Sequence, residues 1–271
     1  KRSNFKYVKI GKIINIEKSL LNGQKISGHY VQGHVDSTAK VKKIMIVDKT
    51  WVIKLELKDL SVKFKTDDGN LLAVNKINLQ VPASKTLCIV GESGCGKSVT
   101  VSSILKLHDP DSSIIEGEIS YHQDDKDIRQ INEMHSKSKA MQEIRGNQIS
   151  MIFQEPMTAL SPVHTVGDQI CEMMILHKKL SLREASERTI VLLEKVGIPS
   201  PRKRFNLYPF QLSGGMRQRV MIAMALSCNP QVLIADEPTT ALDVTTQSQI
   251  LFLLKELQEE YGMTIILITH D

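Results

Sequence analysis

Stretches in which apolar and polar residues alternate predict half-buried β-strands soon after residue 52. They cover residues 53–57, 60–64 and 73–81, the last one beyond a turn of sequence Asp67-Asp68-Gly69-Asn70. The run 86–90 is instead apolar throughout, the pattern of a strand buried in a parallel sheet. Helical spacing follows over 97–107 and again over 216–227. We therefore expect an α/β core.

Residues 6–51 show a different pattern, with short apolar stretches separated by glycines. The stretches 8–10, 13–17, 30–32 and 39–44 predict the strands of an antiparallel barrel. The charge changes at the same place: residues 1–52 hold 11 lysines and arginines against 3 acids, whereas the other 219 residues hold 24 against 27. The lysines are scattered singly among apolar residues, so we interpret them as a solvated sheet face rather than a nucleic-acid or lipid surface. The chain therefore divides near residue 52 into two pieces of different origin.

Two stretches of the first piece, 14–20 and 26–36, resemble riboflavin synthase. The resemblance places Gly33 and His34 near the lumazine substrate of that family, but it reaches only the later half of the first of two barrels. Half a barrel leaves strand edges and an apolar face uncovered. A metal or acid–base role for His29 and His34 is disfavoured, because Asp36 alone lies at ligand spacing. We expect residues 1–52 to be an inactive partial β-barrel fragment, joined by rearrangement or by an assembly error.

The composition sets limits on the whole chain of 271 residues, of which 41% are hydrophobic. This length and content suit one to two domains with a substantial core. No apolar run approaches the roughly 18 residues of a membrane span, and no signal peptide follows Lys1 and Arg2. Four cysteines show no paired spacing, and Cys88 and Cys228 lie in apolar stretches. We expect reduced, buried thiols in a cytoplasmic protein.

A glycine-rich loop, Gly91-Glu92-Ser93-Gly94-Cys95-Gly96-Lys97-Ser98, joins the run 86–90 to the next helix. Its glycines let the backbone N–H groups point at phosphate oxygens, and the helix N-terminus adds its positive dipole end. Lys97 would reach the β- and γ-phosphates, and Ser98 would ligate Mg²⁺. The alternative is a glycine turn that only caps the helix. The strand–loop–helix context argues against it.

Paired acids end a second apolar strand, residues 232–235. Asp236 would hold Mg²⁺ through water, and Glu237 would polarise the water that attacks the γ-phosphate. A helix cap explains one acid, but not the whole run from Asp236 to Asp243. Gln154 follows the apolar stretch 149–153 and would contact Mg²⁺ or the attacking water, although a single glutamine is usually a surface residue.

The glycine loop, Gln154, the octapeptide 212–219, the paired acids and His270 occur in an order that resembles the nucleotide-binding domain of ATP-binding-cassette (ABC) proteins. The resemblance implies a P-loop NTPase fold over residues 53–271, with an antiparallel β subdomain and an inserted helical subdomain at about 156–228. The finer wording resembles the ATPase subunits of oligopeptide and dipeptide importers, a group that includes nickel carriers. One example is Phe153-Gln154-Glu155-Pro156-Met157-Thr158.

The resemblance also implies roles for single residues. Ser213 would cap its helix and face the γ-phosphate of ATP on a second subunit, which requires a dimer. His270 would hold the γ-phosphate region, and Phe64 would stack on adenine unless it is simply a core strand residue. The catalytic residues implied are Glu237, His270 and Gln154, and the Mg²⁺ ligands are Ser98, Gln154 and Asp236. The ATP contacts implied are Phe64, Gly91, Ser93, Gly94, Cys95, Gly96, Lys97, Ser98, Val99, Ser213, Gly214, Gly215 and Asp243.

The function expected from the resemblance is ATP hydrolysis that energises peptide import. It implies a second ATPase subunit, identical or different, two membrane permease subunits and, indirectly, an extracytoplasmic peptide-binding protein. The chain would lie on the cytoplasmic face of the membrane and bind no nucleic acid. Alternatives are a soluble ABC ATPase of DNA repair or translation, riboflavin synthesis, and a non-functional hybrid fragment. Missing barrel strands argue against riboflavin synthesis, and the absence of a second cassette or long coiled coil argues against the soluble class.

The chain departs from the family pattern in three places, and the first two do not touch the phosphates. Ser84-Lys85 replaces the usual Gly-Glu turn, and Phe210 replaces a histidine. The chain ends at Asp271, where the family continues. We therefore expect a domain truncated at its C-terminus that hydrolyses ATP poorly or not at all, because terminal residues such as His270 fray without later structure.

Overall fold

The computed structural model describes residues 13–16, 37–40, 52–67, 69–124, 127–240 and 242–269. The chain forms two compact units, Lys1–Thr50 and Trp51–Asp271. In the first unit, β1 (Ile13–Ile16) pairs antiparallel with β2 (Ser37–Lys40). Strand β1 matches the stretch expected at 13–17, whereas β2 shares only residues 39 and 40 with the stretch expected at 39–44, and residues 41–44 lie outside the described residues. The strands expected at 8–10 and 30–32, with His29, Gly33 and His34, lie outside the described residues.

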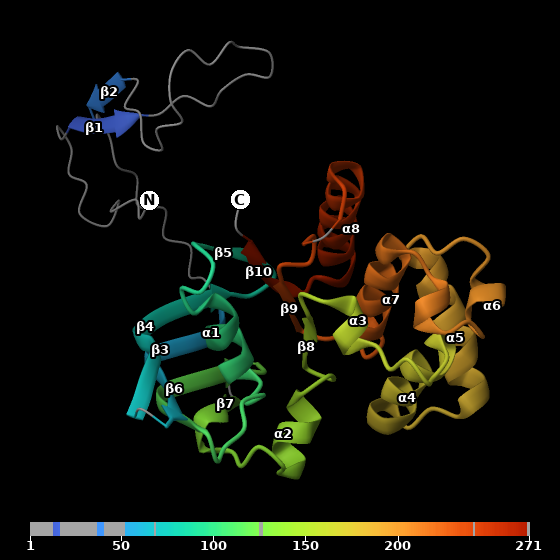
Figure 1. The fold of residues 1–271 in the computed structure, drawn as a ribbon, viewed down its shortest axis with the longest axis horizontal. Coiled ribbons are helices and arrows are strands. Elements are labelled where there is room, and N and C mark those ends of the chain that lie inside the picture. Colours follow the sequence, from blue (N-terminus) through green and yellow to red (C-terminus); the bar gives the residue numbers. More distant parts are fainter. Residues whose placement is uncertain are drawn as a thin grey trace. The chain divides into compact units, whose positions relative to one another are not determined.

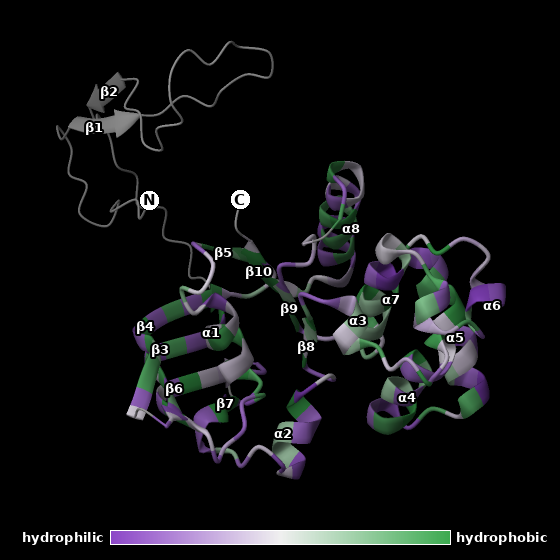
Figure 2. Ribbon diagram, in the orientation of Figure 1, coloured by the Kyte–Doolittle hydropathy of each residue, from purple (hydrophilic) through white to green (hydrophobic). Residues whose placement is uncertain are grey.

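The second unit contains an antiparallel sheet of order β4-β3-β6-β7 (Figure 1). Its strands are β3 (Ile53–Thr66), β4 (Gly69–Pro82), β6 (Ser113–His122) and β7 (Ile128–Gln130). The alternating stretches 53–57 and 60–64 are one strand, because the register shifts between Leu57 and Leu60 without ending the pairing with β4. Figure 2 shows hydrophobic and hydrophilic residues alternating along these strands. One face is the core side, with Leu55, Leu57 and Leu60 almost fully buried.

A second sheet is parallel throughout and has the order β5-β10-β9-β8. Its strands are β5 (Thr86–Val90), β8 (Ile149–Ile152), β9 (Val232–Asp236) and β10 (Thr264–Thr269). Every residue of β8 and β9 is buried, as their continuous apolar sequences predict. Because the strands are parallel, their C-terminal ends meet along one side of the sheet, here called the carboxyl edge. It is formed by Val90, Thr269, Asp236 and Ile152.

The expectation that β5 and Cys88 are buried is wrong. Residues Thr86, Cys88 and Val90 are exposed, because β5 is the outer strand of the parallel sheet within the described part of the chain. A strand with a neighbour on one side only can leave one of its faces uncovered. Cys228, in contrast, is fully buried, as expected from its apolar surroundings.

Two helices directly follow strands of the parallel sheet in the sequence. Helix α1 (Lys97–Ile104) follows β5 and ends three residues before the predicted boundary. Helix α8 (Val244–Tyr261) connects β9 to β10. A 3-10 turn at Ile131–Glu133 and helix α2 (Lys139–Ile144) lead from β7 to β8.

The segment between β8 and β9 is helical and forms a group to one side of the parallel sheet (Figure 1). Its helices are α3 (Pro156–Ala159), α4 (Val166–Lys178), α5 (Leu182–Lys195), α6 (Pro201–Arg204) and α7 (Gly214–Leu226), with a 3-10 turn at Pro209–Gln211. Ile170 of α4, Leu193 of α5 and Val220 of α7 belong to one buried cluster that also contains Leu233 of β9. The group is therefore anchored to the sheet by a continuous core. Among the described residues, no helix has the length and apolar character needed to cross a membrane.

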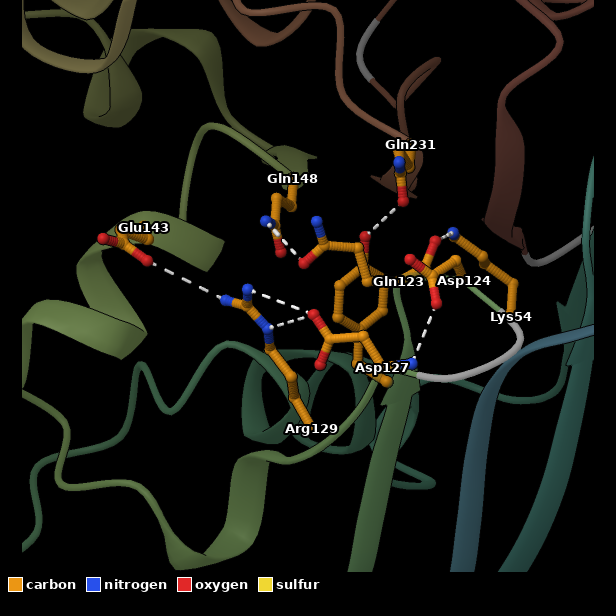
Figure 3. Close-up of polar contacts among 9 residues, drawn as sticks. Lys54, Gln123, Asp124, Asp127, Arg129, Glu143, Gln148 and Gln231 are labelled. Atoms are coloured by element: carbon orange, nitrogen blue, oxygen red, sulfur yellow. Dashed lines mark hydrogen bonds and ion pairs between the residues drawn. The ribbon is translucent and has the colours of Figure 1, made fainter.

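A polar cluster joins the β6–β7 hairpin to the N-terminal ends of β8 and β9 (Figure 3). The buried Tyr121 hydroxyl donates to Gln231 Oε1 at 2.6 Å, and Gln148 Nε2 donates to Gln123 Oε1 at 3.1 Å. Burial raises the pKa of Tyr121. These bonds tie the antiparallel sheet to the side of the parallel sheet opposite the carboxyl edge.

Candidate functional site

The glycine loop lies at the carboxyl edge between β5 and α1, and its shape depends on glycine. Gly94 has φ 77° and Gly96 has φ 91°, in the left-handed region that side chains disfavour. A Cβ atom on Gly96 would lie 2.7 Å from the carbonyl oxygen of Ala73. The loop therefore requires glycine at Gly96 for both its backbone conformation and its space.

Lys97 and the start of α1 give this loop positive charge. Lys97 is 7% exposed as a residue, and its side chain folds back over the loop, where Nζ donates to the carbonyl oxygens of Gly91 at 2.7 Å and Glu92 at 2.8 Å. Helix α1 begins after Gly96, which offers no side-chain cap to the first N–H groups. An ammonium group and a helix N-terminus on one loop suit an anion such as a phosphate.

Ser98 and Asp236 meet although they lie 138 positions apart in the sequence. Asp236 ends β9 and is 5% exposed, and its Oδ1 accepts a hydrogen bond from Ser98 Oγ at 2.9 Å. A hydroxyl and a carboxylate side by side are the oxygen ligands that Mg²⁺ prefers. The residues present therefore fit the expected Mg²⁺ site.

Glu237 and Gln154 form a second pair at the same edge. Gln154 follows β8 and donates from Nε2 to Glu237 Oε2 at 2.7 Å. Glu237 is 6% exposed, and its backbone N–H donates to the carbonyl oxygen of Ile268 at 3.1 Å. Its φ of 48° is unusual for a residue other than glycine. The adjacent strands β8 and β9 thus bring Gln154, a predicted contact to Mg²⁺ or the attacking water, against Glu237, the residue predicted to polarise that water.

Ser213 and Asp243 both cap helices. Ser213 accepts from the N–H of Met216 at 3.4 Å at the start of α7, as its sequence context predicts. Asp243 accepts from the N–H of Thr246 at 3.0 Å at the start of α8. Hydrogen bonds from the backbone and side chain of Thr246 lower the pKa of Asp243. Gly214 and Gly215 lie in the first turn of α7. A Cβ atom added to Gly215 would lie 3.1 Å from Cγ2 of Thr246.

The remaining predicted residues are placed as follows. Phe64 on β3 is half-buried, packs against the core and contacts His108 edge-on with ring centroids 5.1 Å apart, an arrangement that fits its alternative reading as a core strand residue. Ser93 and Cys95 are exposed on the glycine loop, and Val99 of α1 packs partly against the core. His270 lies outside the described residues.

Sequence reasoning missed Thr240, whose Oγ1 donates to Glu237 Oε2 at 3.2 Å. The signal was present in the stretch Glu237-Pro238-Thr239-Thr240, because proline after the first residue favours a tight turn. Such a turn brings its first and fourth residues together.

Comparison with known proteins adds a family match over residues 74–240, described as ABC transporter. The oligopeptide transport ATP-binding protein OppD of Bacillus subtilis is 52% identical over 218 residues, covering 80% of this chain and 59% of the relative. OppD of Escherichia coli strain K12 is 50% identical over 217 residues, covering 80% and 62%. The chain thus spans about 60% of the length of the curated relatives it matches.

Solved structures agree with this match. A dimeric, post-hydrolysis structure of the ATP-binding cassette MJ0796, bound to ADP and Pi, has a TM-score of 0.69 and 32% identity, covering 80% of this chain and 88% of that chain. The structure of cbiO1 from Clostridium perfringens has a TM-score of 0.61 and 29% identity, covering 81% and 79%. These similarities confirm the expected P-loop fold with a parallel and an antiparallel sheet. The family match lies wholly within the second unit, so the riboflavin-synthase resemblance of residues 6–51 gains no support from it.

Proposed function

The chain belongs to the ABC transporter family, and we propose that it binds and hydrolyses ATP to energise peptide import. The observation that carries the proposal is the convergence of two polar pairs beside the glycine loop. The pairs are Ser98 with Asp236 and Gln154 with Glu237. The first pair provides oxygen ligands for Mg²⁺, and the second provides the Glu237 carboxylate, which the hydrogen bond from Gln154 holds in place.

Each group at the carboxyl edge has a chemical task in this proposal. The N–H groups of the glycine loop and Lys97 bind the phosphates, and Ser98, Asp236 and Gln154 hold Mg²⁺. When bound, Mg²⁺ neutralises phosphate charge and orients the oxygens. Glu237 polarises a water whose oxygen bonds to the γ-phosphorus as the bond to ADP breaks, and its carboxylate takes up the proton that the water releases.

Further residues complete the proposed site. His270 contacts the γ-phosphate region, and the Ser213–Gly215 segment and Asp243 serve a nucleotide shared with a second ATPase subunit, identical or different. Phe64, whose ring contacts His108 in a T-shaped arrangement, would stack on the adenine.

Peptides are the proposed cargo because two relatives about half identical to this chain are named for oligopeptide and dipeptide transport. Import of this kind requires two permease subunits in the membrane and an extracytoplasmic peptide-binding protein, with this chain at the cytoplasmic face. We further propose that residues 1–52 and 53–271 are separate domains, and that 156–228 is a helical subdomain of the second.

A binding experiment tests the phosphate loop. Lys97→Ala should abolish the binding of a fluorescent ATP analogue, because it removes the ammonium group from the loop. Lys255→Ala is the matched control. Lys255 is exposed on α8, so this substitution removes the same positive charge away from the loop. Equal affinity of the Lys97→Ala variant and the unchanged chain would refute the assignment.

A turnover experiment tests the base. Glu237→Gln should keep ATP binding and stop phosphate release, because the amide cannot take up a proton from water while Asp236 is retained. Both forms are assayed with the partner ATPase present. Unchanged turnover in the variant would exclude the role of Glu237.

Uptake of a labelled peptide by cells with and without this chain tests the cargo, and equal uptake would argue against peptide import.

A further inference from the structure

The turn after β9 holds Glu237 in a strained backbone conformation. Glu237 has φ 48°, and Pro238 follows it. The N–H of Thr240 donates to the carbonyl oxygen of Glu237 at 3.1 Å, which closes a four-residue turn. A left-handed residue other than glycine costs roughly 1–3 kcal/mol and persists only when its surroundings hold it. Here the surroundings include the hydrogen bond from the Glu237 N–H to Ile268.

This turn places a second donor on the carboxylate of Glu237. Thr240 Oγ1 donates to Oε2 at 3.2 Å, and Gln154 Nε2 donates to the same oxygen at 2.7 Å. The two donors come from different places, one from the turn itself and the other from the end of β8. Because Glu237 is 6% exposed, its charge needs such partners, and hydrogen bonds to a carboxylate are stronger than neutral ones.

We propose that Thr240 is a positioning residue that, together with Gln154, fixes the orientation of the Glu237 carboxylate toward the attacking water. The inference rests on the proposed function, because it assigns Thr240 to the same hydrolysis. Each donor limits rotation of the carboxylate group, and two donors that reach the same oxygen from different elements limit it more than one does. Small misplacements of a reacting group reduce rates strongly.

This role predicts a specific kinetic pattern. Thr240→Val removes the hydroxyl at nearly constant volume and should lower kcat about tenfold, the lower end for a lost hydrogen bond to a charged group. KM for ATP should stay within about twofold, since Thr240 holds the base rather than the nucleotide. Thr240→Ser keeps the donor and should restore most of kcat.

The matched control is Thr239→Val. Within the described part of the chain, the Thr239 hydroxyl makes no hydrogen bond, although the Thr239 carbonyl oxygen accepts from Gln247 Nε2 at 3.2 Å. Phosphate release is measured over a range of ATP concentrations with the partner ATPase present. A Thr240→Val variant with unchanged kcat would overturn the proposal, as would an equal loss in Thr239→Val.

A second measurement needs no nucleotide. The unfolding midpoint in denaturant is determined for Thr240→Val, Glu237→Ala and the double variant. If the contact exists in solution, Thr240→Val lowers the midpoint in the unchanged background and much less in the Glu237→Ala background. Additive effects would overturn the contact. Lack of turnover in the unchanged chain would refute the proposed function alone, while the unfolding cycle would still decide the contact.

Discussion

Replacing Gly96 by alanine tests how far the glycine loop depends on its backbone shape. The added Cβ atom meets two obstacles: a φ of 91° and the Ala73 carbonyl oxygen at 2.7 Å. The left-handed conformation costs about 1–2 kcal/mol for a residue with a side chain. Overlap in a packed site adds about 1–3 kcal/mol. We therefore expect Gly96→Ala to lower the free energy of unfolding by about 2–5 kcal/mol.

The matched control is Gly262→Ala at the end of α8. Gly262 has φ 62°, and a Cβ atom there meets nothing within 4 Å. The control therefore carries the conformational cost of about 1–2 kcal/mol without the overlap. The difference between the two variants mainly reports the overlap of the Gly96 Cβ atom with its neighbours, of which the Ala73 carbonyl oxygen is the nearest.

Two assays read out this comparison. Denaturant unfolding gives the stabilities, and titration with a fluorescent ATP analogue gives the affinities. Gly96→Ala should lose ATP binding, because relief of the overlap moves the N–H groups of the loop, while Gly262→Ala should bind normally. Equal stability loss in both variants, or normal ATP affinity of Gly96→Ala, would refute the reasoning.

Two further predictions concern stability. Ser84→Ala should lower the free energy of unfolding by about 1 kcal/mol, because it removes the 2.7 Å bond from Ser84 Oγ to the Gly262 carbonyl oxygen. Ser84→Gly should leave the free energy of unfolding nearly unchanged in the same denaturant assay, because glycine relieves the left-handed φ of 54° and so offsets the lost hydrogen bond. Equal losses of stability in Ser84→Ala and Ser84→Gly would contradict this explanation. Burial raises the pKa of Tyr121, so on raising the pH the Tyr121 hydroxyl loses its proton in the unfolded chain before it does so in the folded one. The free energy of unfolding should therefore fall as the pH rises above the ordinary tyrosine pKa of about 10. Tyr121→Phe should flatten this alkaline loss in unfolding curves measured between neutral and alkaline pH, and an unchanged loss would refute the assignment.

Local features of the site could be predicted from the sequence because each depends on neighbouring residues. A glycine pattern between a strand and a helix determines the loop around Gly94 and Gly96. Ser213 caps α7 because a serine before a helical stretch accepts from the first turn. The position of Asp236 at the end of β9 follows from the apolar run before it.

The contacts between distant residues could not be predicted in this way. Ser98 reaches Asp236, and Gln154 reaches Glu237, only because the parallel strands adopt the order β5-β10-β9-β8. Hydrophobic periodicity contains no information about that order. The same reason explains the error at Cys88, since an apolar strand looks alike at the centre and at the side of a sheet.

Other differences come from backbone irregularities. The left-handed Asp59 lies where the register of β3 shifts, so the alternation is interrupted although the strand continues to Thr66. The left-handed Glu237 has no sequence signature beyond the following proline. Its position depends on a hydrogen bond to Ile268 of another strand.

Alkylation of the cysteines tests the central claim, nucleotide binding at the glycine loop, most directly. Cys95 lies exposed on that loop, and Cys88 lies exposed on β5, so both react in the same sample. Rates of labelling at each thiol are measured by mass spectrometry with and without Mg²⁺–ATP. Nucleotide on the loop should slow labelling of Cys95 strongly and leave Cys88 unchanged. An unchanged rate at Cys95 under saturating Mg²⁺–ATP would contradict the account.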